Sequence, residues 1–472
     1  MAIESTLPTA SGVSARGVDE LAAQLTGSLI RPEHRGYEAA RRIWNGMILR
    51  RPAAIARCAD ADDVATAIRF ARAHELPIAI RGGGHNVAGT AVCERGLVVD
   101  LSPMRAVRLD SSRRTVHVEG GATWRDVDEI TQPLGLATPG GVVSTTGVAG
   151  LALSGGVSNQ RRLHGMTIDN IVSAEVVTAD GRHIRAAADE NADLLWALRG
   201  GGGNFGVVTS FEFALHDLGP EVYALDVAYP VQDARRVLTR WRDAIADTPD
   251  ALTTDAMLWS LPVIPEVPAH LRNQPYVGIA GMYVGDPADG ERVTRPLREL
   301  STPLLDASGT MAYLDLQRSM DAFFPAGLRY YWKALYLDDF ADAAIDDLVS
   351  RAARRPSART LTIIRHLGGA IARVGSAETA LGDRTAQFML SIDSTWRQPR
   401  NDTRNIRWTR DFWNAQHRFS NGKSYFNFPG LLEEGHEAVE RSYGQNYDRL
   451  ARIKTAYDPQ NALHLNQNIR PA

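Results

Sequence analysis

Glycines gather in three dense clusters that could bind a phosphorylated cofactor. The first, Arg81-Gly-Gly-Gly-His-Asn86, follows the apolar run 77–80, and the others occupy 140–156 and 200–206. Successive glycines let backbone N–H groups approach an anion, because no Cβ blocks the way and positive φ angles are allowed. A tight turn would explain one such cluster equally well. Three clusters in one chain favour a large cofactor that carries phosphates.

Two familiar phosphate-binding motifs are missing. The pattern G-x-x-x-x-G-K-[ST] does not occur in the 472 residues. No G-x-G-x-x-G follows a first strand and opens a helix with an acidic residue about 20 positions further on. These absences disfavour P-loop and Rossmann folds, but by themselves they do not select another cofactor.

The elements that must position the clusters form an alternating α/β pattern up to about residue 218. A hairpin is expected around Ala179-Asp-Gly181, because a turn signal there separates two strand-like runs. The expected strands are 77–80, 97–101, 115–118, 171–178, 182–186 and 207–215, and the expected helices are 62–71, 123–134 and 191–198.

The pattern changes from about residue 219. Strand-like runs at 223–229, 276–284, 331–336, 360–364 and 388–394 alternate with polar helices at 233–246, 290–300 and 342–353. This pattern predicts an α+β fold in which helices cover one face of an antiparallel sheet. We therefore expect a first domain over 1–218 with its core at about 48–218, a second over 219–421, and a C-terminal segment over 422–472 that returns to the first.

Composition excludes several classes of protein. The chain is long enough for two hydrophobic cores, and its 44% hydrophobic and 23% charged residues are ordinary for a globular protein. A net charge of −3 gives no reason to expect nucleic acid or an anionic membrane as a partner. No apolar run approaches the about 20 residues of a membrane helix. Two cysteines and no signal-like N-terminus suggest a cytoplasmic protein without disulfides or a cysteine-built metal site.

The clusters and further motifs together resemble a known family. In order along the chain they are Arg81-Gly-Gly-Gly-His-Asn86, Gly140-Gly-Val-Val-Ser-Thr-Thr-Gly147, Leu153-Ser-Gly-Gly156, Ile168-Asp-Asn170, Gly200-Gly-Gly-Gly-Asn-Phe-Gly206, Tyr425-Phe-Asn427 and Asn466-Gln-Asn-Ile469. This set resembles the berberine bridge enzyme-like branch of the vanillyl-alcohol oxidase superfamily, with its PCMH-type FAD-binding domain. The match covers about 45–218 and 422–472, whereas the middle region resembles the family only loosely.

The resemblance implies FAD as the cofactor, bound covalently to the histidine that follows the three glycines. His85 occupies that place, although a loop histidine that merely caps backbone groups is the alternative. Many members add a second link through a cysteine, but this chain has Val143 there, so the resemblance implies a single link, as in bacterial monocovalent members. The residues that the resemblance places at FAD are Arg81, Gly82, Gly83, Gly84, His85, Asn86, Val143, Thr145, Thr146, Gly147, Gly150, Gly155, Gly156, Asn204, Gly206, Val207, Val208, Tyr425 and Asn427.

By the same resemblance, Tyr425 lies over the flavin as a base or a substrate anchor. A free phenol has a pKa of about 10, so a basic Tyr425 needs a nearby cation or donor, for which the sequence offers Lys423, Arg373 and His366. A buried tyrosine bonded to a backbone carbonyl is the alternative. Asn427 would orient the site, since an amide does not exchange a proton at neutral pH.

Two histidines complete the set of catalytic candidates. His164 stands where many relatives have a tyrosine that contacts substrate, and a surface histidine is the alternative. His366 lies beside an expected strand of the sheet that usually roofs the flavin. No metal is expected.

The activity implied is oxidation of a hydroxyl or related C–H donor by hydride transfer to flavin N5, with O2 as acceptor. The substrate would be a small sugar-like molecule or a secondary metabolite, and the protein a monomer or homodimer. Two alternatives stay open: a flavin-dependent monooxygenase or cyclase that uses a flavin–oxygen species, and a flavin-binding protein without turnover.

Overall fold

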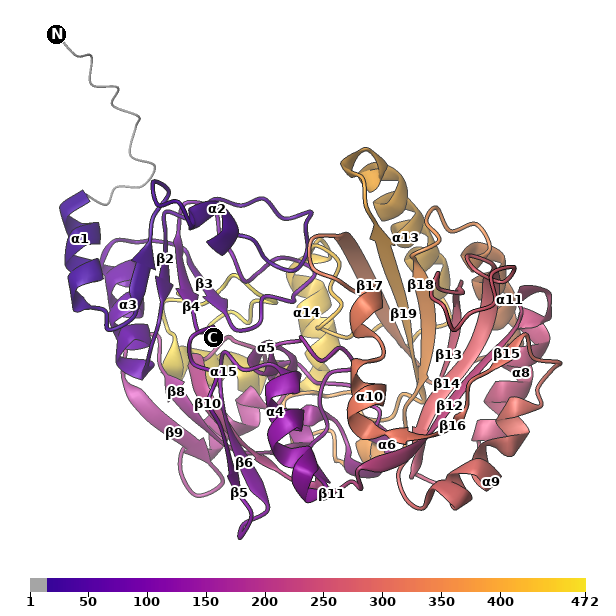
Figure 1. Ribbon diagram of the computed structural model, residues 1–472. Helices are drawn as coiled ribbons and strands as arrows, with labels where there is room; N and C mark the ends of the chain where they lie inside the picture. Colours follow the sequence, from indigo (N-terminus) through magenta and orange to yellow (C-terminus); the bar gives the residue numbers. More distant parts are fainter. Residues whose placement is uncertain (1–14) are drawn as a thin grey trace.

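The computed structural model describes residues 15–472, so residues 1–14 of the expected first domain lie outside the described part. Two sheet-containing regions lie side by side (Figure 1). The chain builds the first region, crosses to the second near residue 219, and returns to the first at its end.

A four-stranded sheet opens the first region, in the order β1-β2-β4-β3. Strand β4 pairs in parallel with both β2 and β3, and its four residues are all buried, as expected for a parallel strand covered on both faces. Helix α3 (Ala61–Ala73) packs against this sheet and begins after Asp60, whose carboxylate accepts a hydrogen bond from the Asp63 N–H at 2.9 Å. The strands are β1 (Ser28–Ile30), β2 (Ala54–Arg57), β3 (Ile78–Arg81) and β4 (Leu97–Asp100).

A five-stranded antiparallel sheet completes the first region, in the order β5-β6-β10-β8-β9. The hairpin of β8 and β9 confirms the turn expected at Ala179-Asp-Gly181. Apolar side chains of this sheet pack with three helices in one core. The strands are β5 (Val107–Asp110), β6 (Thr115–Glu119), β8 (Ile171–Val177), β9 (His183–Ala187) and β10 (Val207–Ala214), and the helices are α4 (Trp124–Thr131), α5 (Val148–Leu153) and α7 (Ala192–Leu198).

The second region is built on one large antiparallel sheet, in the order β15-β12-β14-β13-β18-β19-β17, with β16 beside β12. We call it the large sheet. Its strands are β12 (Glu221–Pro230), β13 (Leu252–Ser260), β14 (Pro275–Tyr283), β15 (Leu305–Asp306), β16 (Gly309–Ala312), β17 (Arg329–Leu337), β18 (Leu361–His366) and β19 (Phe388–Trp396).

Helices cover one face of the large sheet, and the other face looks toward the first region (Figure 1). The covering helices are α8 (Ala234–Ile245), α9 (Pro287–Arg298), α11 (Asp342–Ala352) and α13 (Asp402–His417). This arrangement confirms the α+β fold expected from the sequence. Strand β13 and helix α13 were not among the expected elements.

The C-terminal segment returns to the first region through α14 (Gly435–Tyr443) and α15 (Tyr447–Tyr457). Buried Lys454 donates to the Asn204 carbonyl at 2.7 Å and to Asp458 at 2.6 Å. The Asn204 side chain in turn accepts a hydrogen bond from the Ile469 N–H at 3.0 Å. These contacts tie the end of the chain to the third glycine cluster.

Candidate functional site

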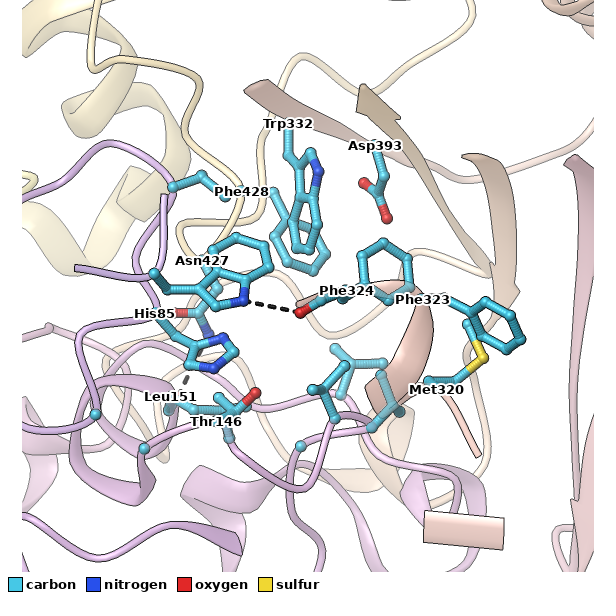
Figure 2. A pocket seen from close by; sticks show the side chains of 18 of the residues that line it. His85, Thr146, Leu151, Met320, Phe323, Phe324, Trp332, Asp393, Asn427 and Phe428 are labelled. Atoms are coloured by element: carbon cyan, nitrogen blue, oxygen red, sulfur yellow. Dashed lines mark hydrogen bonds between the residues drawn. The ribbon is translucent and has the colours of Figure 1, made fainter. Parts of the chain in front are cut away.

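A cavity of about 790 Å³ lies between the glycine clusters and the open face of the large sheet. This volume is within the roughly 300–1,000 Å³ of small-molecule and cofactor sites. In Figure 2, His85 and Thr146 stand on the side of the first region, and Trp332 and Asp393 of the large sheet lie across the cavity from them. The cavity is therefore shared by both regions.

Two glycine clusters touch each other backbone to backbone at the cavity wall. A Cβ added to Gly83 would lie 2.5 Å from the Gly147 nitrogen, and one added to Gly147 would lie 2.3 Å from the Gly83 nitrogen. Gly84 adopts a left-handed φ of +68°. Gly150 also lines the cavity, but a Cβ there would meet no protein atom within 4 Å. The clusters thus pack tightly against each other and leave open backbone toward the cavity, which fits a bound cofactor.

His85 lines the cavity with its ring held on two sides. The ring stacks on Trp44 with centroids 4.8 Å apart, and Nε2 lies 3.1 Å from Thr145 Oγ1. Burial lowers the pKa of His85 to about 4, and the negative charge of Asp321 opposes this effect. The imidazole is therefore neutral at neutral pH, which is the form with a nucleophilic nitrogen.

Asp321 connects the second region to the turn that carries Thr145. It begins a short 3₁₀ helix (Asp321–Phe323) after α10 (Tyr313–Arg318). Its carboxylate accepts hydrogen bonds from the Ser144 N–H at 2.8 Å and the Ser144 hydroxyl at 2.5 Å, and it pairs with Arg125 at 3.1 Å. The second region therefore helps to fix the position of Thr145, the residue that contacts the His85 ring.

Tyr425 and Asn427 come together at the cavity. Tyr425 Oη accepts hydrogen bonds from the Gly156 N–H at 2.8 Å and from Asn427 Nδ2 at 2.9 Å. Burial raises the pKa of Tyr425, whereas the bonds from Asn427 and Gly156 lower it. A backbone carbonyl was the alternative partner, but both observed partners are donors, which favour the phenolate.

The large sheet supplies cavity residues that the sequence did not indicate. Strand register places Asp226, Asp255 and Arg365 in one row across β12, β14, β13 and β18. Further along the strands, Asp393 lies between Leu361 and Trp332. The only available signal was the occurrence of charged residues inside apolar strand runs. Aromatic and other apolar side chains line the rest of this side, among them Met257, Trp259, Tyr276, Met320, Phe323, Phe324 and Phe428.

Two of these carboxyl groups are shifted toward their neutral form. Burial raises the pKa of Asp393 to about 6, although Arg365 and the Ser391 hydroxyl act against it. Burial and the neighbouring charge of Asp306 raise the pKa of Asp226 to about 6. Both groups can therefore change protonation state near neutral pH.

His164 and His366 lie outside the residues that line the cavity. His164, in the short helix α6 (Arg161–His164), stacks on His216 with ring centroids 3.9 Å apart. His366 faces Arg162, whose Nη1 lies 2.9 Å from His366 Nε2. Burial and the two arginines of α6 lower the pKa of His366 to about 2. The structure therefore places both histidines in contacts between elements, outside the cavity lining.

The cations expected near Tyr425 lie elsewhere as well. Lys423 pairs with Asp383 at 3.4 Å, and Arg373 pairs with Asp250. The cation that does act on Tyr425 is Arg365, which lowers the pKa of its phenol. Sequence reasoning missed Arg365 because cross-strand neighbours cannot be read from one strand alone.

Most residues expected at FAD line the cavity, and five do not. Those that line it are Gly82, Gly83, Gly84, His85, Asn86, Val143, Thr146, Gly147, Gly150, Gly206, Val207, Val208, Tyr425 and Asn427; those outside the lining are Arg81, Thr145, Gly155, Gly156 and Asn204. The outside five support the wall.

Four of these five residues make contacts that hold the cavity wall in place. Arg81 donates to the Ala40 carbonyl at 2.5 Å, and a Cβ on Gly155 would lie 2.7 Å from the Tyr425 ring. Thr145 contacts His85, and Asn204 holds the C-terminal segment.

Metal and membrane features are not found in the part of the chain that the structure describes. No group of three or more histidine, cysteine or acidic side chains between residues 15 and 472 could hold a metal ion. Over the same residues, no helix has the length and apolar character needed to cross a membrane.

This fold and this cavity define a flavin-dependent oxidoreductase. Residues 52–187 match the family model described as FAD binding domain, and residues 424–470 match the one described as berberine and berberine like. The chain belongs to the berberine bridge enzyme-like FAD-linked oxidoreductases of the vanillyl-alcohol oxidase superfamily, and FAD is its cofactor.

Several relatives match almost the full length of the chain. It is 30% identical over 464 residues to (R)-6-hydroxynicotine oxidase of Paenarthrobacter nicotinovorans, covering 95% of this chain and 97% of the relative. The crystal structure of 6-hydroxy-D-nicotine oxidase from Arthrobacter nicotinovorans superposes with a TM-score of 0.85 at 27% identity, covering 95% and 98% of the two chains. A chitooligosaccharide oxidase shares the fold, with a TM-score of 0.84 at 22% identity and coverage of 97% and 100%.

Proposed function

We propose that this chain is an FAD-linked oxidase that removes a hydride from a small organic molecule and passes the electrons to O2. The observation that carries the proposal is the shared cavity, which is lined by the glycine clusters, His85, Tyr425 and strands of the large sheet. FAD would lie against Gly82–Gly84, Gly147–Gly150 and Gly206–Val208. When bound, it supplies the two-electron acceptor at N5.

The flavin would be linked to the protein through His85 alone. Two features support this link: the imidazole is neutral at working pH, and Thr145 orients the ring. Val143 lines the cavity where a second link would require a thiol, and both cysteines, Cys58 and Cys93, are buried outside the cavity lining. A single attachment point follows.

Tyr425 is the proposed base for the substrate proton. Its oxygen sits at the cavity wall between two fixed donors, Gly156 and Asn427, which act against the rise in the pKa of Tyr425 that burial causes. Asn427 would act by orienting Tyr425. His164 and His366 have no proposed part in proton transfer, since both lie outside the cavity lining.

Mass spectrometry tests the flavin link, and oxygen accounting tests the reaction. We expect the intact mass of acid-denatured wild type to include one FAD, and that of His85→Ala to include none; FAD released from both would contradict the link. Stoichiometric H2O2 release would support the oxidase. Incorporation of labelled oxygen into the product would instead indicate a monooxygenase or cyclase, and a flavin that no donor reduces would indicate a binding protein.

A further inference from the structure

Arg365 is a buried cation that faces the cavity and forms no ion pair with any residue between 15 and 472. The residue is 6% exposed, and its Nη1 has no hydrogen-bond partner among residues 15–472. In the antiparallel register Arg365 on β18 lies directly opposite Asp255 on β13. Directly opposite residues of unlike charge are expected to pair. Here the Asp255 carboxylate instead binds Arg161, which is fully buried.

The other carboxylates of the cavity wall stand on backbone positions well separated from Arg365. Asp226 lies in the same row but three strand spacings away, which is about 14 Å at the usual 4.8 Å between strands. Asp393 lies opposite Leu361, four residues along β18 from Arg365, or about 13 Å of strand. No carboxylate of the described residues therefore forms an ion pair with Arg365, although its charge lowers the pKa of Asp393.

A buried guanidinium with an unsatisfied N–H group is costly unless a ligand supplies the acceptor. Its planar fork matches a carboxylate in size and geometry. The Phe428 ring centroid lies 5.5 Å from Arg365 Cζ and 5.2 Å from the centroid of the Tyr425 ring. A carboxylate bound by Arg365 would thus lie beside the proposed base.

The rest of the substrate side is apolar and aromatic. Phe428 meets Trp332 edge to face with centroids 5.3 Å apart, and Phe324 meets the other side of Trp332 at 5.6 Å (Figure 2). Trp259 and Phe323 extend this surface with centroids 5.2 Å apart. Such walls bind a flat apolar body and offer few partners to the many hydroxyls of a sugar.

We propose that the substrate is a flat, largely apolar molecule that carries one carboxylate, and that Arg365 binds this carboxylate and determines specificity. This inference rests on the proposed function, because it assigns the substrate class of the same cavity. It predicts discrimination against neutral sugars, since a neutral sugar would leave Arg365 without an anion.

Benzoate and benzamide are suitable probes, because they share a flat ring and differ in charge. Calorimetric titration of the holoenzyme should show benzoate binding roughly tenfold or more tighter than benzamide, as expected for a charge-assisted pair. Arg365→Gln should reduce this preference to near equality, and Arg365→Lys should keep part of it, since lysine retains the charge without the fork. Arg373→Gln is the matched control, because Arg373 is exposed and paired with Asp250 outside the cavity lining.

Two results would overturn the assignment: equal binding of the two probes by wild type, or an undiminished benzoate preference in Arg365→Gln. If Arg365 acts only on the ionisation of Tyr425, the Arg365→Gln variant will shift the pH profile of flavin reduction and keep the benzoate preference. That result would also overturn the assignment. Calorimetry reports binding whether or not the flavin is attached. If these samples lack flavin, that result counts against the proposed function. The comparison of benzoate with benzamide still tests the role of Arg365.

Discussion

The carboxylate of Asp321 accepts two hydrogen bonds from Ser144, one from the backbone N–H and one from the hydroxyl. The two residues are 177 positions apart and belong to different regions of the fold. Ser144 precedes Thr145, whose hydroxyl contacts His85. A residue of the second region thus holds the turn that orients the proposed flavin attachment point.

Asp321→Asn should therefore slow attachment of FAD. The change removes the charge and one acceptor while keeping the size of the side chain. A hydrogen bond to a charged group contributes about 1.5–3 kcal/mol, so we expect a reduction of roughly tenfold or more in the attachment rate. The measurement is the fraction of chain carrying covalent FAD, by intact mass, against time after FAD is added to apoprotein. Asp315→Asn, at an exposed position on α10, is the control, and equal rates for both variants would refute the role of Asp321.

Tyr425→Phe should lower the rate of flavin reduction by roughly 10²–10⁴-fold, the usual contribution of a positioned general base. The flavin content should stay at the wild-type level, because the ring still packs against Gly155. Stopped-flow absorbance, with a donor that reduces the wild type, measures the rate. Tyr336→Phe is the matched control, since Tyr336 packs edge to face with Tyr425 and its buried hydroxyl has no partner in the described chain. A Tyr425→Phe enzyme as fast as this control would remove Tyr425 as the base.

Two glycine variants should separate a clash with protein from a clash with cofactor. Gly83→Ala brings a methyl group to 2.5 Å from the Gly147 backbone, so it should destabilise the apoprotein as well as reduce FAD binding. Gly150→Ala meets no protein atom within 4 Å and replaces a helical glycine, so the apoprotein should be unchanged or up to about 1 kcal/mol more stable.

FAD binding should nevertheless weaken in Gly150→Ala, because the new methyl group points into space that we assign to FAD. Denaturant unfolding of the apoprotein and FAD titration measure the two effects. Unimpaired FAD binding by Gly150→Ala would mean that the cofactor does not approach this part of the wall.

The glycine clusters could be predicted from the sequence because residue type alone fixes their behaviour. Only glycine allows Gly83 and Gly147 to touch through their backbones, and the left-handed Gly84 continues the same turn. The positions of strands β3 and β4 in the sequence were also predictable, since their apolar runs are short and bounded by turn residues. These features depend on neighbours in the chain and not on neighbours in space.

The substrate side could not be predicted, because it depends on register. Strand β13 mixes threonine and aspartate with apolar residues, so it lacks the apolar run that identifies a buried strand. Without β13, nothing places Asp255 opposite Arg365 or assigns Arg161 as the partner of Asp255. His164 and His366 show the same limit, since their positions in the chain did not reveal that their side chains lie outside the cavity lining.

Asp393→Asn should flatten the dependence of stability on pH. Asp393 is 2% exposed, and burial raises its pKa from 3.8 to about 6 in the folded protein. The folded state therefore binds a proton more tightly than the unfolded state does. Protonated Asp393 therefore contributes to the stability of the folded state. This contribution is complete below about pH 4 and is lost as pH rises through about 6, and it amounts to roughly 3 kcal/mol in the free energy of unfolding.

Asparagine cannot ionise but keeps an oxygen that accepts the Ser391 hydroxyl bond, so the variant should lack this loss. Urea unfolding midpoints at pH 4, 5, 6 and 7 measure the difference. Asp411→Asn, at an exposed position on α13, should retain the wild-type pH dependence. If Asp393→Asn lost stability between pH 4 and 7 as steeply as wild type, Asp393 would already be ionised at pH 4 and its proposed burial as a neutral acid would be wrong.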